Sequence, residues 1–471
     1  MRLVVVGNGM AGSRLASEVR ARDPENRHIT ITVIGAEARG PYNRVLLSNV
    51  LAGTASPEQV RLPAQAGDGV TVRLGVTVTA IDREAREVRT ADGRREPYDV
   101  LALATGSEAV VPPIPGAGRA IALRTMDDCD RILAAARTAT TAVVVGGGLL
   151  GVEAARGLSG RGLRVTLLHH TGHLMDRQLD AGAGAVLGDA LAGLGVTVRT
   201  GARAAAIRAG GVELSTGEIL PAGVVVLACG VRPLTGLAED AGLEVGRGVV
   251  VDDRLRTSDP AIYAIGECAQ HDGTVYGLVA PAWEQAAVVA DLITGACPSA
   301  RYRGSRLVTR LKARSVELAA MGETHLAEDP DSAVEVVTFT HRARGIYRKL
   351  VIRDERLVGA ILLGAAPTVG TLTQLYDRGG PLPGDPAGLL FPGLDDGAVP
   401  ADTPVRMPDS ARVCECNNVT KGRIRACWEA GARDLAAVTA ATRATTGCGS
   451  CKDAVEGLIG WLCAQEEEVP A

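Results

Sequence analysis

One strand–loop–helix unit occurs twice in this 471-residue chain, and the duplication limits the possible folds more than any other feature. Residues 3–12 read LVVVGNGMAG and residues 142–151 read AVVVGGGLLG. Each is an apolar run that ends in G-x-G-x-x-G and leads into a helical pattern, with a second apolar run, 29–34 or 164–168, about 20 residues later. Glycine lets the backbone of such a loop approach a pyrophosphate, which then meets free N–H groups at the helix N-terminus. The sequence therefore predicts two Rossmann βαβ units, each able to bind a dinucleotide.

Composition and charge exclude several classes of protein. The chain is 46% hydrophobic and 22% charged, as globular proteins usually are. Its formal net charge of −4 gives no reason to expect a nucleic acid, and no apolar run reaches the ~18 residues needed to span a membrane. The N-terminal strand runs into a glycine loop and does not resemble a secretory signal. Six cysteines show no disulfide-like spacing: Cys129, Cys229, Cys268, Cys297, Cys427 and Cys463. We therefore expect a reduced, cytoplasmic protein that binds neither nucleic acid nor membrane.

The residues after the second strand of each unit bear on which dinucleotide binds there. Glu37 follows this strand in the first unit, where a carboxylate accepts hydrogen bonds from the hydroxyls of an adenosine ribose. A solvated loop acid is the alternative. The second unit has His169 and His170, and neither an acid nor the Arg expected for a 2′-phosphate. We therefore expect NADH to be accepted, with weaker discrimination against NADPH than an acid would provide. The alternative is that both histidines are ordinary surface residues.

The pattern changes in the last third of the chain. Residues 334–340 and 348–353 alternate between polar and apolar, and the apolar run 357–363 follows a short charged turn. This alternation predicts an antiparallel sheet in a separate domain. Residues 376–411 are rich in Pro and Gly, which predicts a semi-extended linker.

Four cysteines follow this linker in two close pairs. They are Cys414 and Cys416, in C-x-C, and Cys448 and Cys451, in C-x2-C. Close pairs that are far apart in sequence let a chain fold back around one metal centre, and four thiolates indicate iron–sulfur or zinc. C-x-C is tighter than the spacing of most structural zinc sites, and glycines flank Cys448, where backbone N–H groups can approach cluster sulfur. The pattern favours iron–sulfur, with zinc as the alternative.

Two further segments resemble the pyridine-nucleotide flavoprotein reductases. Residues 98–107, YDVLALATGS, with the proline-rich 112–116, are similar to the crossover segment of that family. Residues 257–268, TSDPAIYAIGEC, are similar to its second FAD motif, with Glu267 where the family usually has Asp. The resemblance implies FAD on the first unit and NAD(P)H on the second.

The implied fold class is α/β, with two Rossmann-like dinucleotide-binding domains, a small α+β domain with an antiparallel sheet, and a small helical [2Fe–2S] domain. The expected boundaries are 1–115 with 250–298 for a discontinuous FAD domain, 116–249 for NAD(P)H, 302–375 for the α+β domain, 376–411 for the linker and 412–465 for the cluster domain.

The motifs and the resemblance together define the candidate binding residues. For FAD they are Gly7, Gly9, Met10, Ala11, Gly12, Glu37, Arg44, Ala104, Thr105, Gly106, Gly266, Glu267 and Trp283. For NAD(P)H they are Gly146, Gly148, Leu149, Gly151, Glu153, His169 and Gly230. A core position is the alternative for Trp283, and a helix-surface acid is the alternative for Glu153. We expect no catalytic acid or base, because hydride transfer between stacked rings needs positioning above all.

A narrower resemblance covers nearly the whole chain. Residues 40–48, GPYNRVLLS, and 174–180, LMDRQLD, are similar to the N-terminal flavoprotein part of NADH-dependent nitrite reductases and to electron-transfer subunits of assimilatory nitrate reductases. Residues 411–463 resemble the bacterioferritin-associated-ferredoxin-like [2Fe–2S] domain, whose ligands would be the four paired cysteines. The disulfide reductases of the wider family carry C-x4-C beside the flavin, whereas residues 40–50 contain no cysteine.

The resemblance implies an order of electron carriers: nicotinamide, FAD, [2Fe–2S] and then an external acceptor, because flavin takes up electron pairs and releases single electrons. We expect no sirohaem or molybdenum module in these 471 residues, so that a partner reduces the final substrate. The expected partner is the molybdenum-containing catalytic subunit of an assimilatory nitrate reductase. A separate nitrite reductase is the second possibility, and a zinc-stabilised dinucleotide-sensing scaffold is a third.

Overall fold

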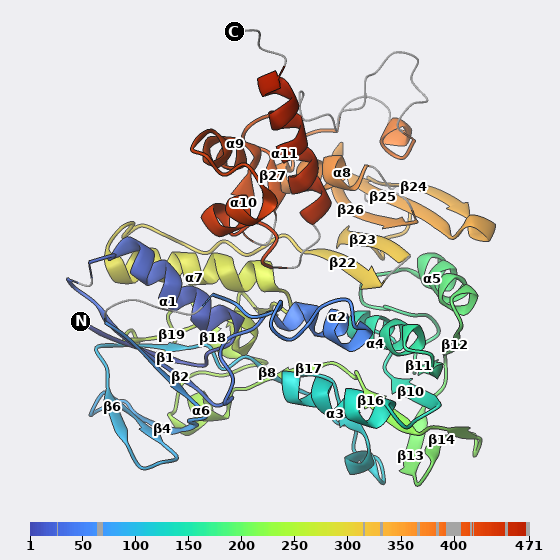
Figure 1. The fold of residues 1–471 in the computed structure, drawn as a ribbon, viewed down its shortest axis with the longest axis horizontal. Coiled ribbons are helices and arrows are strands. Elements are labelled where there is room, and N and C mark those ends of the chain that lie inside the picture. The colour runs from blue at the N-terminus through green and yellow to red at the C-terminus, as the bar shows by residue number, and fades with distance from the viewer. Residues whose placement is uncertain are drawn as a thin grey trace.

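A computed structural model gives the fold shown in Figure 1. The structure describes residues 1–25, 27–63, 69–313, 316–329, 333–364, 368–382, 386–391, 407–414, 417, 419–447 and 451–467. Within these residues the main parts of the chain are two five-stranded parallel sheets, one five-stranded antiparallel sheet and a helical C-terminal module. This arrangement is the predicted α/β fold.

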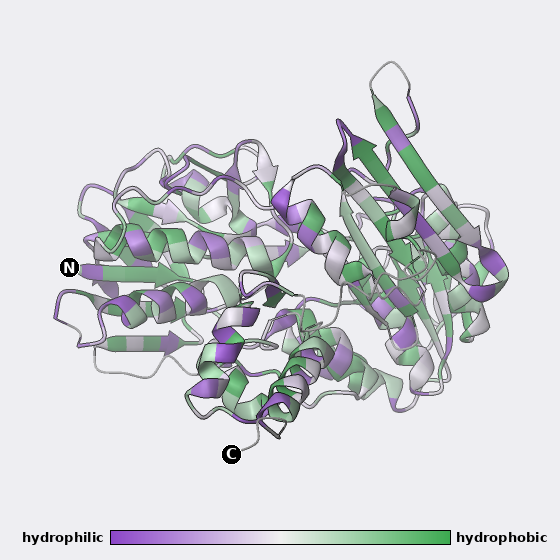
Figure 2. Ribbon diagram, turned by 90° about the horizontal axis from the view of Figure 1, so that it is seen from above, coloured by the Kyte–Doolittle hydropathy of each residue, from purple (hydrophilic) through white to green (hydrophobic). Residues whose placement is uncertain are grey.

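The first unit forms a five-stranded parallel sheet. In spatial order its strands are β19 (Ile262–Ala264), β7 (Val100–Leu103), β1 (Arg2–Val6), β2 (Thr30–Gly35) and β3 (Val70–Leu74). Helices α1 (Met10–Arg22) and α7 (Val279–Thr294) lie side by side over this sheet (Figure 1). Helix cover explains the nearly continuous apolar strands, which Figure 2 shows as hydrophobic bands. Because β19 comes after the second unit in sequence, the chain returns to complete the first sheet.

The second unit repeats this arrangement. Its sheet has the order β12 (Val196–Arg199), β11 (Arg164–Leu168), β10 (Thr141–Val145), β16 (Val224–Leu227) and β9 (Ile121–Ala122). Its helices are α3 (Met126–Ala136), α4 (Leu149–Gly160) and α5 (Ala181–Gly193). The two units are joined where β8 (Ser107–Ala109) pairs antiparallel with β17 (Val231–Pro233).

Short elements complete both units. The first antiparallel ribbon is β4 (Val78–Asp82), β5 (Glu87–Thr90) and β6 (Arg95–Pro97), and the second is β13 (Ala204–Arg208), β14 (Gly211–Leu214) and β15 (Ile219–Pro221). A third small sheet contains β18 (Val249–Val251), β20 (Ala269–His271) and β21 (Thr274–Val275). The short helices are η1 (Arg44–Leu46), α2 (Leu47–Ala52), η2 (Ala117–Arg119), α6 (Gly236–Asp240) and η3 (Gly266–Cys268).

The predicted antiparallel sheet follows the two units. Its order is β22 (Val308–Ala313), β23 (Val316–Gly322), β26 (Arg356–Leu363), β25 (Ile346–Arg353) and β24 (Val334–His341), and η5 (Arg342–Arg344) joins the last two. Alternate side chains take opposite faces, as a strand requires. Leu362 packs with helix α8 (Val369–Arg378), whereas Ile361 and Leu363 pack with the core of the second unit. One face of the sheet is therefore covered by its own helix and the other by the second unit.

The start of the expected linker differs from the prediction. Residues 376–378 form the last turn of α8, and 386–389 form a short helix, η6 (Pro386–Leu389). Leu390 is completely buried against the antiparallel sheet, with Leu382 and Phe391 beside it. The reason is physical: apolar residues between the prolines gain by leaving water, which outweighs the extended preference of the segment. The remaining part of the expected linker lies mostly outside the described residues.

The C-terminal part, which we call the cysteine module, comprises the described residues from 407 onward. Its elements are β27 (Arg412–Cys414), β28 (Val419–Thr420), α9 (Lys421–Glu429), α10 (Leu435–Thr442) and α11 (Lys452–Glu467). The module lies above α1 and α7 and next to α8 (Figure 1). Its core continues into the first unit, because Trp283 of α7 belongs to the same buried cluster.

The longest described helices, α7 and α11, have 16 residues each. Among the helices that the structure describes, none combines the length and the apolar character needed to cross a membrane.

One partly buried charge pair connects the second unit to the antiparallel sheet. Asp180 caps α5 by accepting the Ala183 N–H at 2.9 Å, and it also accepts from Tyr347 Oη at 2.7 Å and Lys349 Nζ at 3.0 Å. Burial opposes the charge on Asp180, but these hydrogen bonds outweigh burial and lower its pKa. The pair therefore stabilises the fold above the unfolded-state pKa of about 4 and stops doing so as pH falls through the lower folded-state value.

We predict that Asp180→Asn lowers the free energy of unfolding by about 2 kcal/mol at pH 7, because Lys349, only 5% exposed, loses its counter-ion. The control is Asp189→Asn, whose partner Arg342 crosses the same interface at the surface, where ion pairs contribute little. Denaturant unfolding at pH 7 and near pH 3 measures both. Equal losses for the two variants, or a difference that grows as pH falls, would contradict the assignment.

Candidate functional site

The carboxyl edge of the first sheet opens into a cavity of ≈860 Å³ that extends to the second unit. Most predicted FAD residues line it: Gly7, Gly9, Met10, Ala11, Glu37, Arg44, Ala104, Thr105, Gly106, Gly266 and Glu267. The second unit contributes Leu149, Leu150 and Glu153 of α4. Cofactor pockets usually have volumes of about 300–1,000 Å³, so the space suits a large cofactor whose reactive end meets a second ligand.

The two glycine loops have the same geometry, which tests whether the units fit dinucleotides. Gly7 and Gly146 have φ of +111° and +112°, and a Cβ there would lie 2.1 and 2.2 Å from the carbonyl oxygens of Ala104 and Ala228. By contrast, a Cβ on Gly9 or Gly148 would meet no protein atom within 4 Å. The first glycine of each motif is thus required by the fold, and the second leaves open space before a helix N-terminus. The space and the exposed N–H groups suit a pyrophosphate.

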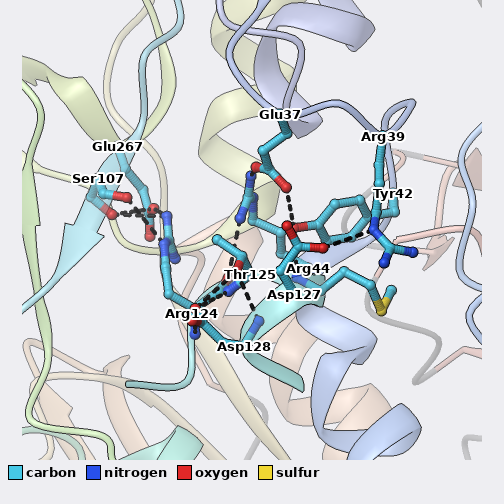
Figure 3. Close-up of polar contacts among 11 residues, drawn as sticks. Glu37, Arg39, Tyr42, Arg44, Ser107, Arg124, Thr125, Asp127, Asp128 and Glu267 are labelled. Atoms are coloured by element: carbon cyan, nitrogen blue, oxygen red, sulfur yellow. Dashed lines mark hydrogen bonds and ion pairs between the residues drawn. The ribbon is translucent and has the colours of Figure 1, made fainter. Parts of the chain in front are cut away.

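Glu37 is held at the end of β2 by two side chains from the following loop (Figure 3). It accepts a hydrogen bond from Tyr42 Oη at 2.8 Å and forms an ion pair with Arg44. Burial raises the pKa of Tyr42, so its hydroxyl keeps the proton that it donates. Arg44, a predicted FAD contact, therefore also orients the carboxylate that is predicted to bind a ribose.

Glu267, on η3, is held in a similar way by residues that the sequence analysis did not single out (Figure 3). Ser107 Oγ donates to it at 2.7 Å, and Arg124 forms an ion pair with it. The carbonyl of Arg124 also accepts from Arg44 at 3.1 Å, so this residue connects the two acidic positions. Thr125 and Asp128 form a capping box at the start of α3 and hold the turn that contains Arg124. The T-x-x-D pattern was a visible signal for the cap, but no local pattern indicates the partners of Arg124.

His169 lies inside the second unit and is 5% exposed, whereas His170 is exposed. The surface alternative therefore applies to His170 and is wrong for His169. Its Nδ1 accepts the N–H of Gly147 at 3.0 Å, and its Nε2 lies 3.1 Å from Asp176. Burial lowers the pKa of His169, which keeps the ring neutral with Nδ1 as the acceptor.

The strand register gives His169 a different place from the one expected. Val6 is aligned with Ile34 in the first unit, and Val145 with Leu168 in the second. Counting onward, His169 corresponds to Gly35, and the counterpart of Glu37 is Thr171. The conclusion that the second unit lacks a ribose-binding acid is unchanged, but the position in question moves to Thr171.

The two units differ in which residue fills the space between the glycine loop and the end of the second strand. A Cβ on Gly35 would lie 2.7 Å from Asn8 Cβ, and a Cβ on Gly147 would lie 2.8 Å from His169 Cβ. The first unit thus has its side chain in the glycine loop, and the second has its side chain at the strand end. The space between the glycine loop and the strand end holds only one side chain in each unit. In the second unit this side chain is His169, which is therefore buried.

The remaining NAD(P)H candidates surround the edge of the second sheet. Glu153 is 7% exposed on α4 and faces the cavity, so it is not a surface acid. Gly151 lies in the first turn of the same helix, as Gly12 does in α1. Gly230 follows β16 with φ of +96°, and its carbonyl accepts the N–H of Val110 at 2.9 Å.

Two of the four paired cysteines lie within the described residues. Cys414 ends β27 with no exposed surface, and Cys451, 6% exposed, comes directly before α11. Both belong to one buried cluster, and Asn417 Nδ2 donates to Cys414 Sγ at 3.7 Å. Cys416 and Cys448 lie outside the described residues, so no complete ligand set can be seen among those described. Two thiols in one core with an N–H donor suit a sulfur-ligated cluster.

Trp283 does not take the place expected of a flavin contact. Helix α7 begins at Val279, and its residues Pro281, Ala282 and Glu284 line the cavity. Trp283 is buried among the residues of the cysteine module, and its indole N–H donates to the carbonyl of Met10 at 3.2 Å. Because successive side chains of a helix point in different directions, Trp283 faces the module whereas Pro281, Ala282 and Glu284 face the cavity.

Comparison with known proteins gives the class of this site. Residues 1–286 match the pyridine nucleotide-disulphide oxidoreductase family, 308–377 match the rubredoxin NAD+ reductase C-terminal domain, and 412–461 match the BFD-like [2Fe-2S] binding domain. The chain belongs to the pyridine nucleotide-disulphide oxidoreductase family. These matches confirm the fold class, the enzyme class of NAD(P)H-dependent oxidoreductase, and the cofactors FAD, NAD(P)H and [2Fe–2S]. The residue roles and domain boundaries stay predictions.

More specific similarities point within this family. The nitrite reductase [NAD(P)H] large subunit of Klebsiella oxytoca is 37% identical over 98% of this chain and 49% of its own length. The assimilatory nitrate reductase electron transfer subunit of Bacillus subtilis (strain 168) is 36% identical over 100% of this chain and 61% of its own length. The chain thus spans about half to three fifths of these relatives. The covalent putidaredoxin reductase–putidaredoxin complex has a similar structure, with a TM-score of 0.73, 26% identity, and 83% of this chain and 95% of that chain covered.

The open space at the second glycine of each motif makes a matched pair of substitutions possible. We predict that Gly9→Ala reduces the flavin content of the purified protein, because the new methyl group enters the pyrophosphate space of the first unit. Gly148→Ala should leave flavin content unchanged and raise the KM for NADH about tenfold, roughly 1.4 kcal/mol. Flavin absorbance and steady-state kinetics measure these effects, and circular dichroism controls for folding. Loss of flavin in Gly148→Ala would contradict the assignment of the two units.

Proposed function

We propose that the chain is an electron-transfer flavoprotein subunit that passes electrons from NAD(P)H, through FAD and a [2Fe–2S] cluster, to the molybdenum catalytic subunit of an assimilatory nitrate reductase. The observation that carries the proposal is the shared wall between cavity and cysteine module. Met10, Val279 and Ala280 line the cavity, and they also pack against the group of buried apolar side chains that contains Cys414 and Cys451.

The residues of the chain have binding and orienting roles in this scheme. Bound FAD would accept a hydride and release its electrons singly, and a [2Fe–2S] cluster would carry one electron at a time. The glycine loops would bind the two pyrophosphates, and Glu37 and Glu267 would accept hydrogen bonds from ribose and ribityl hydroxyls. Overall, NAD(P)H loses two electrons and one proton and becomes NAD(P)+, the acceptor protein gains two electrons, and the proton goes to solvent.

The identity of the partner rests on the relatives. The similarity to the Bacillus subtilis electron transfer subunit supports a nitrate reductase partner, and the similarity to nitrite reductase large subunits supports a nitrite reductase as the second candidate. Co-purification from the native host, followed by mass spectrometry, would distinguish them. We also place the protein in the cytoplasm, where reducing conditions keep metal-binding thiols such as those of the cysteine module in the reduced state.

For the nucleotide, we predict that NADH is used, with a kcat/KM advantage over NADPH below about a hundredfold, or roughly 2.7 kcal/mol. Thr171 stands in register with Glu37, and a hydroxyl discriminates against a 2′-phosphate less than a carboxylate does. Steady-state kinetics with both nucleotides measure the ratio, and a larger preference would contradict the interpretation.

For the outlet of electrons, we predict that Cys451→Ser abolishes reduction of the physiological acceptor while NADH still reduces the flavin. Cys427→Ser is the matched control: this thiol on α9 lies outside the four-cysteine pattern, so acceptor reduction should remain. Stopped-flow absorbance follows the flavin, and EPR of the reduced protein detects the cluster.

Two outcomes would contradict this part of the proposal. Acceptor reduction that survives in Cys451→Ser would remove the cluster from the path. Zinc in place of iron in anaerobically purified protein would favour the zinc-stabilised scaffold.

A further inference from the structure

The cysteine module is tied to the flavin side of the first unit by one buried amide. Asn43 is 1% exposed and lies between the cavity-lining residues Tyr42 and Arg44. Its Nδ2 donates to the carbonyl of Thr446 at 2.7 Å and to the carbonyl of Gly447, directly before the predicted ligand Cys448. Its Oδ1 accepts the N–H of Val45 at 3.1 Å, which caps η1. One side chain therefore joins the flavin loop, residues 40–46, to the cluster-ligand loop, whose described residues here are 443–447.

A second link runs beside the first. Arg14 of α1 donates to Asn417 Oδ1 at 2.9 Å, and Asn417 Nδ2 lies 3.7 Å from Cys414 Sγ and 3.3 Å from Thr446 Oγ1. The guanidinium of Arg14 also lies over the ring of Trp283, 4.9 Å from its centroid. Both polar links thus involve residues next to a predicted cluster ligand, Gly447 in the first and Asn417 in the second, and Arg14 connects the second link to Trp283.

The chemistry at Asn43 is selective for an amide. Two carbonyl oxygens converge on Nδ2, which has two N–H donors, and each carbonyl is satisfied by one of them. A carboxylate of the same shape would keep the cap on η1 but would place a negative oxygen against two carbonyls. A buried carbonyl that loses its donor is destabilised, so this contact would open.

We propose that Asn43 is a positioning residue that latches the cluster-ligand loop onto the flavin loop and so fixes the cluster beside the flavin cavity. The proposal deepens the proposed function and rests on it: the two electrons of NAD(P)H leave the flavin site singly through a docked cluster, and not through a module that swings free. The latch acts through position alone, because Asn43 contacts the two loops and is not among the residues that line the cavity.

The test compares Asn43→Asp with Asn49→Asp in the full-length, cofactor-loaded protein. Asn43→Asp keeps the helix cap and removes the two N–H donors. Asn49→Asp makes the same chemical change six positions later, on α2, and none of the described hydrogen bonds to the cysteine module uses Asn49. Asn43→Ser is the second variant if Asn43→Asp does not fold, because its hydroxyl can still cap η1 but cannot reach both carbonyls.

Two readouts separate a latch from a general structural role. Hydrogen–deuterium exchange should speed up in peptides that cover residues 443–451 of Asn43→Asp, with unchanged exchange in the strands of both parallel sheets. In stopped-flow experiments NADH should reduce the flavin at the wild-type rate, while cluster reduction slows about tenfold as the docked population falls. Asn49→Asp should match the wild type in both readouts.

The proposal is overturned if Asn43→Asp and Asn43→Ser keep wild-type exchange and cluster reduction, or if Asn49→Asp gives the same change as Asn43→Asp. If NADH fails to reduce the flavin of the wild-type protein, the proposed function fails. The exchange measurement still tests the latch in that case, so the two failures can be told apart.

Discussion

The close approach of the first glycine of each motif to a neighbouring backbone is the constraint on which the rest of the structure depends. Gly7 passes the carbonyl of Ala104, and Gly146 passes the carbonyl of Ala228, so closely that a Cβ would collide with it. This approach packs strand, loop and helix closely against one another in each unit. It also directs both helix N-termini to the carboxyl edges of their sheets. Ligands of open α/β sheets bind at that edge. The shared cavity follows from two such edges being held together by the β8–β17 pairing.

Charges then set what this cavity can hold. Arg124 pairs with Glu267 and offers its carbonyl to Arg44, whose guanidinium holds Glu37. Both carboxylates are thus oriented by cations that belong to the protein, before any ligand binds. Preorganisation of this kind lowers the entropic cost of binding a long, flexible cofactor. It also explains why a loop from the first unit and a turn from the second are both needed to complete one site.

The predictable parts of this molecule are those with local signals. The glycine loops, the alternating strands and the cysteine pairs each lie within a dozen residues, and the two Rossmann folds and the antiparallel sheet followed from them. The contacts that complete the sites are not local: Arg124 and Glu267 are 143 residues apart, and Asn43 and Thr446 are 403 apart. His169 was expected at the ribose because it directly follows the second strand, and only the strand register shows that Thr171 is the counterpart of Glu37. Trp283 was expected at the flavin because its helix is there, and only the helical period shows that it faces the cysteine module.

The segment that lacks cysteines next to the flavin is the one that contacts the cysteine module. In the disulfide reductases that the chain resembles, the thiols beside the flavin take electrons from it, and residues 40–50 of this chain contain none. Here the same segment presents Asn43, which binds the loop before Cys448, and Met10 and Val279 line the cavity and also pack against the hydrophobic cluster that contains Cys414 and Cys451. In the proposed scheme, electrons therefore leave the flavin near the same segment, and their carrier is a cluster in place of a pair of thiols. A pair of thiols accepts two electrons together, whereas a docked cluster divides the pair, which is what an acceptor of single electrons requires.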